Sequence, residues 1–277
     1  MNIKIVTDST SDLPAALAQE KGITVMPVYV NFGSETYRDR VDIFEDEFYS
    51  KLENSSQQPS TEPPTPEDFA DVYRSISNEA DGIVSIHVST KLSATCNSAQ
   101  RGRELANTDC PIEIIDSETV TMGLGLLVLA AQDYVNSGKS FNEVTEEIKR
   151  MISSIQLLGL LDTLKYLAEG GRIGKASALL GSVLSIKPLL TISDGEIVPA
   201  GQVRTREKGI DELYNFARNT AGINDIAIVY SVMHDEVQTL IERLGSIVPK
   251  ENIRLARLGP ALAVHAGPSI LFMAIRG

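Results

Sequence analysis

The stretch from Gly82 to Ala99 constrains the fold of this chain more than any other segment. Apolar residues typical of a buried strand run directly into a dense group of hydroxyl side chains, and we expect a helix over residues 93–107. The unpaired N–H groups at the start of a helix, together with the helix dipole, favour negative charge there. The segment therefore predicts a pocket for a carboxylate or a phosphate.

Strand-like and helix-like segments alternate along the rest of the chain. We expect strands at residues 3–8, 23–32, 82–89, 112–117, 156–162, 187–192, 197–204, 225–232 and 252–258. We expect helices at residues 12–21, 44–54, from 66 onward, 121–136, 140–154, 207–220 and 235–248. This order predicts the α/β class with two domains, a mainly parallel α/β domain over residues 1–155 and an α+β domain with a mixed sheet over residues 156–277.

Composition narrows the class of protein. The net charge of −12 argues against a nucleic-acid groove and against stable insertion in an anionic membrane. The two cysteines fit no disulfide framework, the N-terminus shows no secretory leader, and the longest apolar run, residues 122–131, is about half of the ~20 residues that a bilayer span needs. We therefore expect a cytoplasmic protein, and a monomer because no heptad seam is visible.

Standard nucleotide and metal motifs fail when they are tested residue by residue. In the string EGGRIGKAS, Glu169 and Ala176 stand where a P-loop requires glycine and a hydroxyl residue. The Gly123–Gly125 pair lacks the third glycine of a dinucleotide fingerprint. The three histidines are far apart, and no G-x-S-x-G elbow occurs, so we expect no metal, no cofactor and no standard hydrolase site.

Uncharged hydrogen-bond donors are then the first candidates for the anion site. We expect Ser93 and the amide of Ala94 to donate to the anion from the start of the helix, although N-capping alone is the commoner role of a serine there. Thr61 lies in a proline-rich loop, residues 55–66, whose stiff backbone suits a fixed hydroxyl; an exposed linker is an equally good explanation.

Two isolated cationic or titratable residues stand in glycine-rich contexts. Arg172 follows Gly170-Gly171, which is typical of a helix C-cap that turns the chain sharply. His265 lies between two Gly-Pro pairs, in a segment that we expect to be rigid and irregular. Each has an ordinary alternative, a surface cation or a hydrogen-bonded core histidine, and for His87 on its buried strand we accept the core role.

Six segments together resemble the DegV family, which is similar to the acyl-binding subunit of bacterial fatty-acid kinase. They occur in the family's order and cover essentially the whole chain: TDSTSDL, STKLSATCNSA, EIIDSETVTMGLGLLV, LKYLAEGGRIGKASALLGSVLSIKPLL, VRTREKGI and GPALAVHAGPS. The resemblance implies two domains that enclose one long-chain fatty acid between them. It implies that Thr61 and Ser93 bind the carboxylate and that Arg172 and His265 lie near the head group or the partner's docking edge. Glu62 departs from the family's loop and brings a carboxylate near this site.

Three functions compete on this basis. The first is a carrier, not an enzyme by itself, that presents palmitate, stearate or oleate to the catalytic subunit of a separate ATP-dependent fatty-acid kinase for phospholipid synthesis. The second is a phosphotransferase or hydrolase that acts through Ser93 and His265. The third is a sensor of a polar anion, which predicts a compact wet pocket in place of a long dry one.

Overall fold

The computed structural model describes residues 2–55, 57–180, 186–232 and 235–277. His234 therefore lies outside the described residues. No helix within these ranges is long and apolar enough to cross a bilayer.

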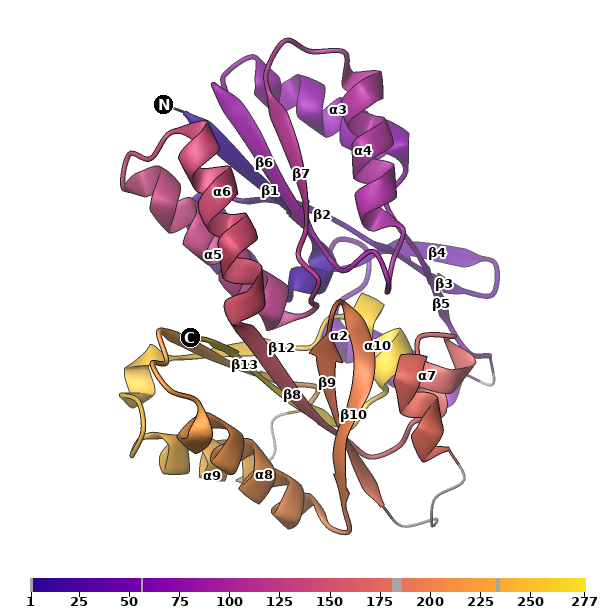
Figure 1. Cartoon of the computed structure of the whole chain (residues 1–277). Helices are drawn as coiled ribbons and strands as arrows, with labels where there is room; N and C mark the ends of the chain where they lie inside the picture. Colours follow the sequence, from indigo (N-terminus) through magenta and orange to yellow (C-terminus); the bar gives the residue numbers. More distant parts are fainter. Residues whose placement is uncertain (1, 56, 181–185, 233–234) are drawn as a thin grey trace.

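A four-stranded parallel sheet forms the centre of the N-terminal half, in the order β2-β1-β6-β7. The strands are β1 (Ile3–Asp8), β2 (Thr24–Met26), β6 (Gly82–His87) and β7 (Ile112–Asp116). Two pairs of helices lie on opposite sides of this sheet (Figure 1), namely α3 (Pro66–Ser77) with α4 (Thr95–Ala106) and α5 (Met122–Asn136) with α6 (Phe141–Met151). Helix α1 (Ala15–Lys21) leads into β2.

A small antiparallel sheet of order β4-β3-β5 extends from this half. It consists of β3 (Tyr29–Phe32), β4 (Glu35–Arg38) and β5 (Ser60–Glu62), with α2 (Glu45–Asn54) beside it. The single strand that we expected over residues 23–32 is therefore two strands in two sheets. Pro27 stands between them and has no N–H to continue a ladder. The loop of residues 55–66 is also partly a strand, because β5 pairs with β3.

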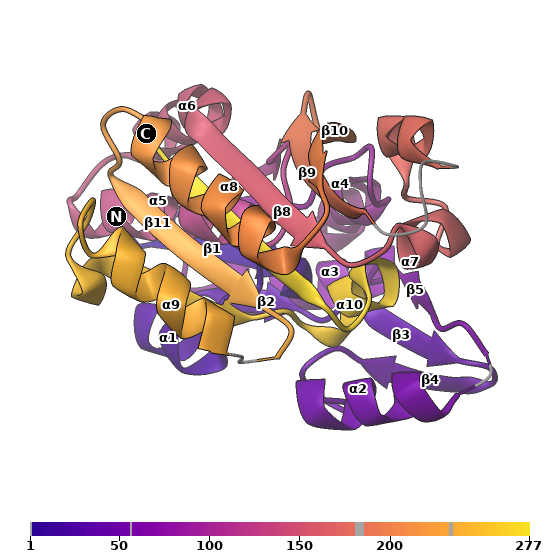
Figure 2. The same cartoon turned by 90° about the horizontal axis from the view of Figure 1, so that it is seen from below.

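The C-terminal half is built on a six-stranded mixed sheet, in the order β10-β9-β8-β13-β11-β12. Its strands are β8 (Ile155–Leu161), β9 (Lys187–Ser193), β10 (Glu196–Val203), β11 (Asp225–Tyr230), β12 (Ile253–Arg257) and β13 (Ile270–Arg276). Only the β11–β12 pair is parallel. Figure 2 shows α8 (Arg206–Asn219) and α9 (Asp235–Leu244) on one face of this sheet. These two sheets confirm the predicted α/β class, parallel first and mixed second.

The remaining helices are short. They are α7 (Lys165–Glu169), α10 (Pro260–Ala266) and the 3-10 helices η1 (Ser9–Ser11), η2 (Ile152–Ser154), η3 (Gly174–Leu179) and η4 (Lys250–Asn252). Two expectations were wrong here. His265 lies in a regular helix, α10, with Pro260 at its first position, and the helix expected from residue 12 begins at Ala15, because Asp12 adopts the left-handed conformation with φ +53°.

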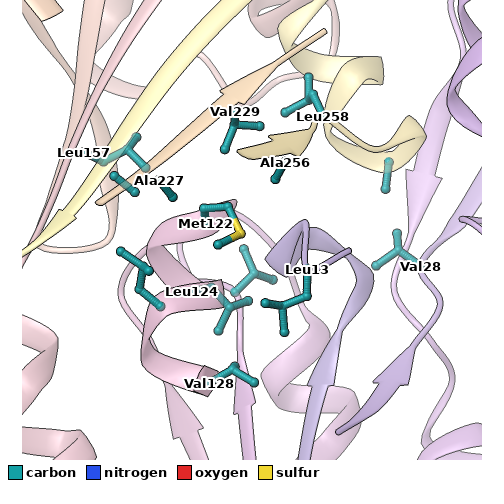
Figure 3. Packing of buried hydrophobic residues seen from close by; sticks show 14 of the residues in the cluster. Leu13, Val28, Met122, Leu124, Val128, Leu157, Ala227, Val229, Ala256 and Leu258 are labelled. Atoms are coloured by element: carbon teal, nitrogen blue, oxygen red, sulfur yellow. The ribbon is translucent and has the colours of Figure 1, made fainter. Parts of the chain in front are cut away.

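One apolar core joins the two halves. Figure 3 shows Met122 of α5 packed between Leu13 on the N-terminal side and Ala227 and Val229 of β11 on the C-terminal side. Helix α5 is buried over most of its length, which agrees with its apolar sequence on all faces. The division into domains after residue 155 stays a prediction, since this core crosses it.

The contact between α3 and α4 depends on a glycine that we expect to tolerate no side chain. A Cβ at Gly102 would lie 2.4 Å from the Cβ of Phe69 and 2.9 Å from the carbonyl oxygen of Pro66. Overpacking costs about 1–3 kcal/mol, and contacts with a Cβ and a backbone carbonyl, which cannot swing aside, favour the upper end, ~3 kcal/mol, against the ~1 kcal/mol that alanine gains as a helix former. Gly102→Ala should therefore lower the free energy of unfolding by about 2 kcal/mol in urea denaturation.

The exposed neighbour Arg101 supplies the control on the same helix. Arg101→Ala should change the free energy of unfolding by less than about 0.5 kcal/mol, as is usual for surface positions. A Gly102→Ala protein as stable as the wild type would show that α3 and α4 can move apart without cost.

Candidate functional site

A cavity of about 160 Å³ lies where the parallel strands of the N-terminal half end and the C-terminal half begins. Chain segments that follow β1, β6 and β7 supply one side of it, and this is the edge where open α/β sheets bind ligands. Its walls are mainly apolar. The lining residues are Thr10, Val28, Thr61, Glu62, Pro63, Val88, Leu92, Ser93, Ala94, Val120, Thr121, Leu167, Arg172, Ile197, Ala261, Leu262, His265, Ala266 and Phe272.

All five residues that the sequence singled out for the anion line this one cavity. They come from β5, the β6–α4 loop, the segment after α7, and α10: Thr61, Ser93, Ala94, Arg172 and His265. The structure thus brings together side chains up to 204 positions apart in the sequence. Their individual roles toward a ligand stay a prediction.

Ser93 lies just before helix α4 and not within it. The helix begins at Thr95 with Ala94 as N-cap, so our expected start was two residues too early. The Ser93 amide donates to the carbonyl oxygen of Ser89 at 3.0 Å, and the Ser93 hydroxyl lies 2.8 Å from that of Thr95. Ser93 is therefore fixed by a turn, with its hydroxyl at the positive end of the helix.

A hydrogen bond joins Thr61 to His265 across the two halves of the molecule. The Thr61 Oγ1 lies 2.8 Å from the His265 Nε2, whereas the His265 Nδ1 is buried without a partner. Because an orphaned N–H is rarer in proteins than an under-satisfied acceptor, we place the proton of the neutral ring on Nε2. His265 then donates to Thr61, and the Thr61 hydroxyl keeps its own hydrogen for an acceptor in the cavity.

Burial keeps the His265 ring neutral. Burial, together with a smaller effect of the positive charge of Arg172, lowers the pKa of His265 to about 4. The absence of a side chain at Gly170 leaves room for the imidazole ring, since a Cβ on residue 170 would lie 2.2 Å from the His265 Nδ1. The sequence indicated only a helix C-cap at Gly170-Gly171, which the structure has, and missed this contact.

Arg172 is the cation of the site. Its Nη1 donates to the carbonyl oxygen of Gly170 at 2.7 Å and its Nε to that of Leu92 at 3.4 Å. Among the residues that the structure describes, no carboxylate pairs with Arg172. Its charge is thus available to an anion, while Glu62 lies exposed at the rim of the cavity.

A fully buried hydrogen-bonded chain supports the wall formed after β1 and β6. Asp8 accepts from the Thr10 amide at 3.1 Å and from the Val88 amide at 3.2 Å, and its Oδ2 lies 2.9 Å from the His87 Nδ1. The His87 Nε2 in turn lies 2.7 Å from the Ser85 hydroxyl. This confirms the structural role that we assigned to His87. The sequence missed Asp8 as its partner, 79 positions away.

No group of three or more potential metal ligands occurs within the described ranges. Ser93 and His265 each have another partner, Thr95 and Thr61, and no hydrogen bond joins the two directly in the described part of the chain. The cavity wall presents neutral hydrogen-bond donors and an arginine that has no carboxylate partner among the described residues, and its interior is apolar. This combination suits an amphipathic anion.

Fold and cavity together define an α/β protein with an apolar cavity between a parallel and a mixed sheet. The chain belongs to the DegV family, described as a family of uncharacterised proteins, which it matches over residues 2–275. A DegV domain-containing protein of Deinococcus radiodurans is 34% identical over 99% of this chain and 98% of its own length.

Two solved structures are also similar to this chain. A DegV family protein of Thermus thermophilus, described by its fatty acid binding, is 36% identical with a TM-score of 0.92, and 100% of each chain is covered. A stearic acid-binding protein of Eubacterium ventriosum is 28% identical with a TM-score of 0.89, over 100% of this chain and 98% of its own.

The neutral state of His265 can be measured directly. Histidine-selective NMR, with His265→Gln to assign the signal, should show no protonation of His265 down to about pH 5, because its pKa lies near 4. Arg172→Met should raise this pKa, but not to the ordinary value of 6.5, since burial is the larger cause. Titration of the wild-type ring near pH 6.5 would contradict the burial that we describe.

Proposed function

We propose that this protein binds one long-chain fatty acid, with its carboxylate at Thr61, Ser93 and the Ala94 amide and its alkyl chain in the apolar cavity. One observation carries this proposal: the mainly apolar cavity has four hydroxyl side chains on its wall, Thr61 and Ser93 among them, together with the N-cap residue of α4 and an arginine that has no carboxylate partner in the described part of the chain. The fatty acid binding of the Thermus thermophilus and Eubacterium ventriosum proteins supports it.

Apolar burial supplies the affinity. A cavity of about 160 Å³ takes about five water-sized groups at ~30 Å³ each, and each buried methylene contributes roughly 0.8 kcal/mol. The alkyl chain of palmitate, stearate or oleate has more carbon atoms than this space holds. We therefore expect apolar side chains of the wall to move aside when such a ligand enters.

The head group is held by weak contacts. Neutral hydroxyl and amide donors satisfy a carboxylate without the bidentate grip of a paired arginine. We propose that the carboxylate so held is presented to the catalytic subunit of a separate ATP-dependent fatty-acid kinase, towards phospholipid synthesis. On this proposal the chain is a cytoplasmic, monomeric carrier and not an enzyme by itself; Arg172 and His265 flank the head group on the side that the kinase approaches.

The competing enzyme function gains less support. A nucleophilic Ser93 needs His265 as its base within hydrogen-bond reach, and both residues have other partners. A polar-anion sensor gains less support as well, because most of the lining side chains carry no polar group.

Bound lipid is the first test. The purified protein is denatured and extracted with solvent, and the extract is analysed by mass spectrometry. We expect palmitate, stearate or oleate at close to one molecule per chain, since the buried tail slows release. Absence of lipid even after incubation with stearate would contradict the proposed function, and turnover of an ester or phosphate substrate by the isolated chain would favour the enzyme.

The head-group contacts are tested by removing one hydroxyl at a time. Ser93→Ala and Thr61→Val should each weaken stearate binding about tenfold, because a hydrogen bond to a charged acceptor contributes about 1.5–3 kcal/mol. Equilibrium binding of radiolabelled stearate measures the effect. Ser98→Ala is the control, as Ser98 lies on α4, the helix that begins just after Ser93, and outside the cavity wall. Wild-type affinity in both site variants would remove Thr61 and Ser93 from the site.

A further inference from the structure

A buried ionic cluster lies behind the cavity, where helix α10 meets the N-terminal half. It consists of Asp12, Asp39, Arg40 and Glu45, and we call it the acidic cluster. Asp12 and Asp39 are each only 1% exposed, and the Arg40 side chain is 15% exposed. No sequence pattern predicted this cluster, and the anion site described above does not include it.

Asp12 ties three segments together. Its Oδ1 accepts from the amide of Gly259, the N-cap of α10, at 2.8 Å and lies 3.2 Å from the guanidinium of Arg40. Its Oδ2 accepts from the hydroxyl of Thr121 at 2.5 Å. Thr121 lines the cavity and has φ +52°, which is strained for a β-branched residue. Asp12 thus holds both the start of α10 and one piece of the cavity wall.

Asp39 lies against the same helix end without a regular hydrogen bond to its carboxylate. Both of its carboxylate oxygens are buried and unpartnered by ordinary geometry, and the nearest donors are the Ser9 hydroxyl and the Ala261 amide in the first turn of α10. The Asp39 amide donates to the carbonyl oxygen of Val28, a cavity residue, at 2.9 Å. Buried carboxylate oxygens without a hydrogen-bond partner, such as those of Asp39, are rare in proteins and require an explanation.

The charges of the cluster do not balance when every carboxyl is ionised. Three carboxylates, Asp12, Asp39 and Glu45, then face one buried guanidinium. The other titratable groups nearby change this little: the Tyr49 hydroxyl donates to the carbonyl oxygen of Leu258, and the guanidinium of Arg257 pairs with the exposed Asp46. Burial raises the pKa of Asp39 to about 7 and that of Asp12 to about 6, against the lowering effect of Arg40.

Helix α10 connects the acidic cluster to the proposed ligand site. It is only seven residues long, its first turn lies against Asp12 and Asp39, and its last turn carries His265, which bonds Thr61 of β5. Figure 2 shows α10 beside β3 and β5. A displacement at one end of so short and rigid an element moves the other end as well.

We propose that Asp39 is a positioning residue of the site. While its carboxyl is protonated, α10 stays packed against the N-terminal half and His265 stays hydrogen-bonded to Thr61. Ionisation of Asp39 weakens the retention of a bound carboxylate. Ionisation of Asp39 adds a second unbalanced negative charge beside Asp12. This charge is of the same sign as that of a bound carboxylate. The favourable dipole of a seven-residue helix is too small to offset a buried charge without a partner. This inference rests on the proposed fatty-acid site.

The test is the pH profile of stearate affinity between pH 6 and pH 8, measured with radiolabelled stearate. Wild-type affinity should fall about fivefold over this range, which is what one pKa unit of coupling between the ligand and a carboxyl with a pKa of about 7 produces. Asp39→Asn, which is permanently neutral and of the same shape, should keep the affinity of the wild type at pH 6 and lose the pH dependence. Asp42→Asn, a surface carboxyl of the same loop, should retain the wild-type slope.

A ligand-free measurement separates this inference from the proposed function. His265 does not titrate near neutral pH, so a shift of its ring NMR signals between pH 6 and pH 8 reports the ionisation of Asp39. We expect that shift in the wild type and not in Asp39→Asn. Failure to bind stearate at any pH would contradict the proposed function alone, and the NMR shift then decides the role of Asp39.

Two results would overturn the role of Asp39. One is an Asp39→Asn protein with the same pH slope as the wild type. The other is a wild-type protein whose stearate affinity and His265 signals are constant from pH 6 to pH 8, a measurement that holds even if the variant does not fold.

Discussion

The structure depends on the burial of helix α5 between the two large sheets. This helix is apolar on every face, so neither half of the chain can leave it exposed. Helix α5 contacts β1 and β6 of the N-terminal half and β8, β11 and β13 of the C-terminal half, and the resulting core is continuous across the junction (Figure 3). The cavity lies beside this core, where segments after three parallel strands meet α10 and β13. The cavity is thus a space on this interface that the described side chains do not fill.

Few charged side chains line this cavity. The protein carries a net charge of −12, yet the wall facing a carboxylate presents neutral donors and one arginine without a carboxylate partner in the described part of the chain. Apart from Glu62 at the rim, the nearby carboxylates are set back, with Asp8 bound to Thr10 and His87 and Asp12 bound to Arg40. Burial keeps the histidine of this wall neutral.

Local patterns predicted local structure well. The buried strand before the hydroxyl cluster and the C-cap at Gly170 both depend on neighbouring residues, and the structure has both. The candidate residues were found through the hydroxyl cluster and the family resemblance. Long-range features escaped prediction: β13 is buried on both faces and shows no alternation, and α10 was hidden by its flanking Gly-Pro pairs. The Asp12–Gly259 and Arg40–Arg257 contacts join residues more than 200 positions apart, for which one sequence contains no signal.

The close approach of Gly170 to the imidazole has a consequence for the evolution of this chamber. A methyl group at position 170 would occupy the space of the His265 ring, so the two positions cannot vary independently. A relative that replaces this glycine must either turn the histidine out of the wall or replace it as well. The residue at position 170 is therefore a marker, readable from sequence alone, of which relatives can keep an imidazole against the threonine in this part of the cavity wall.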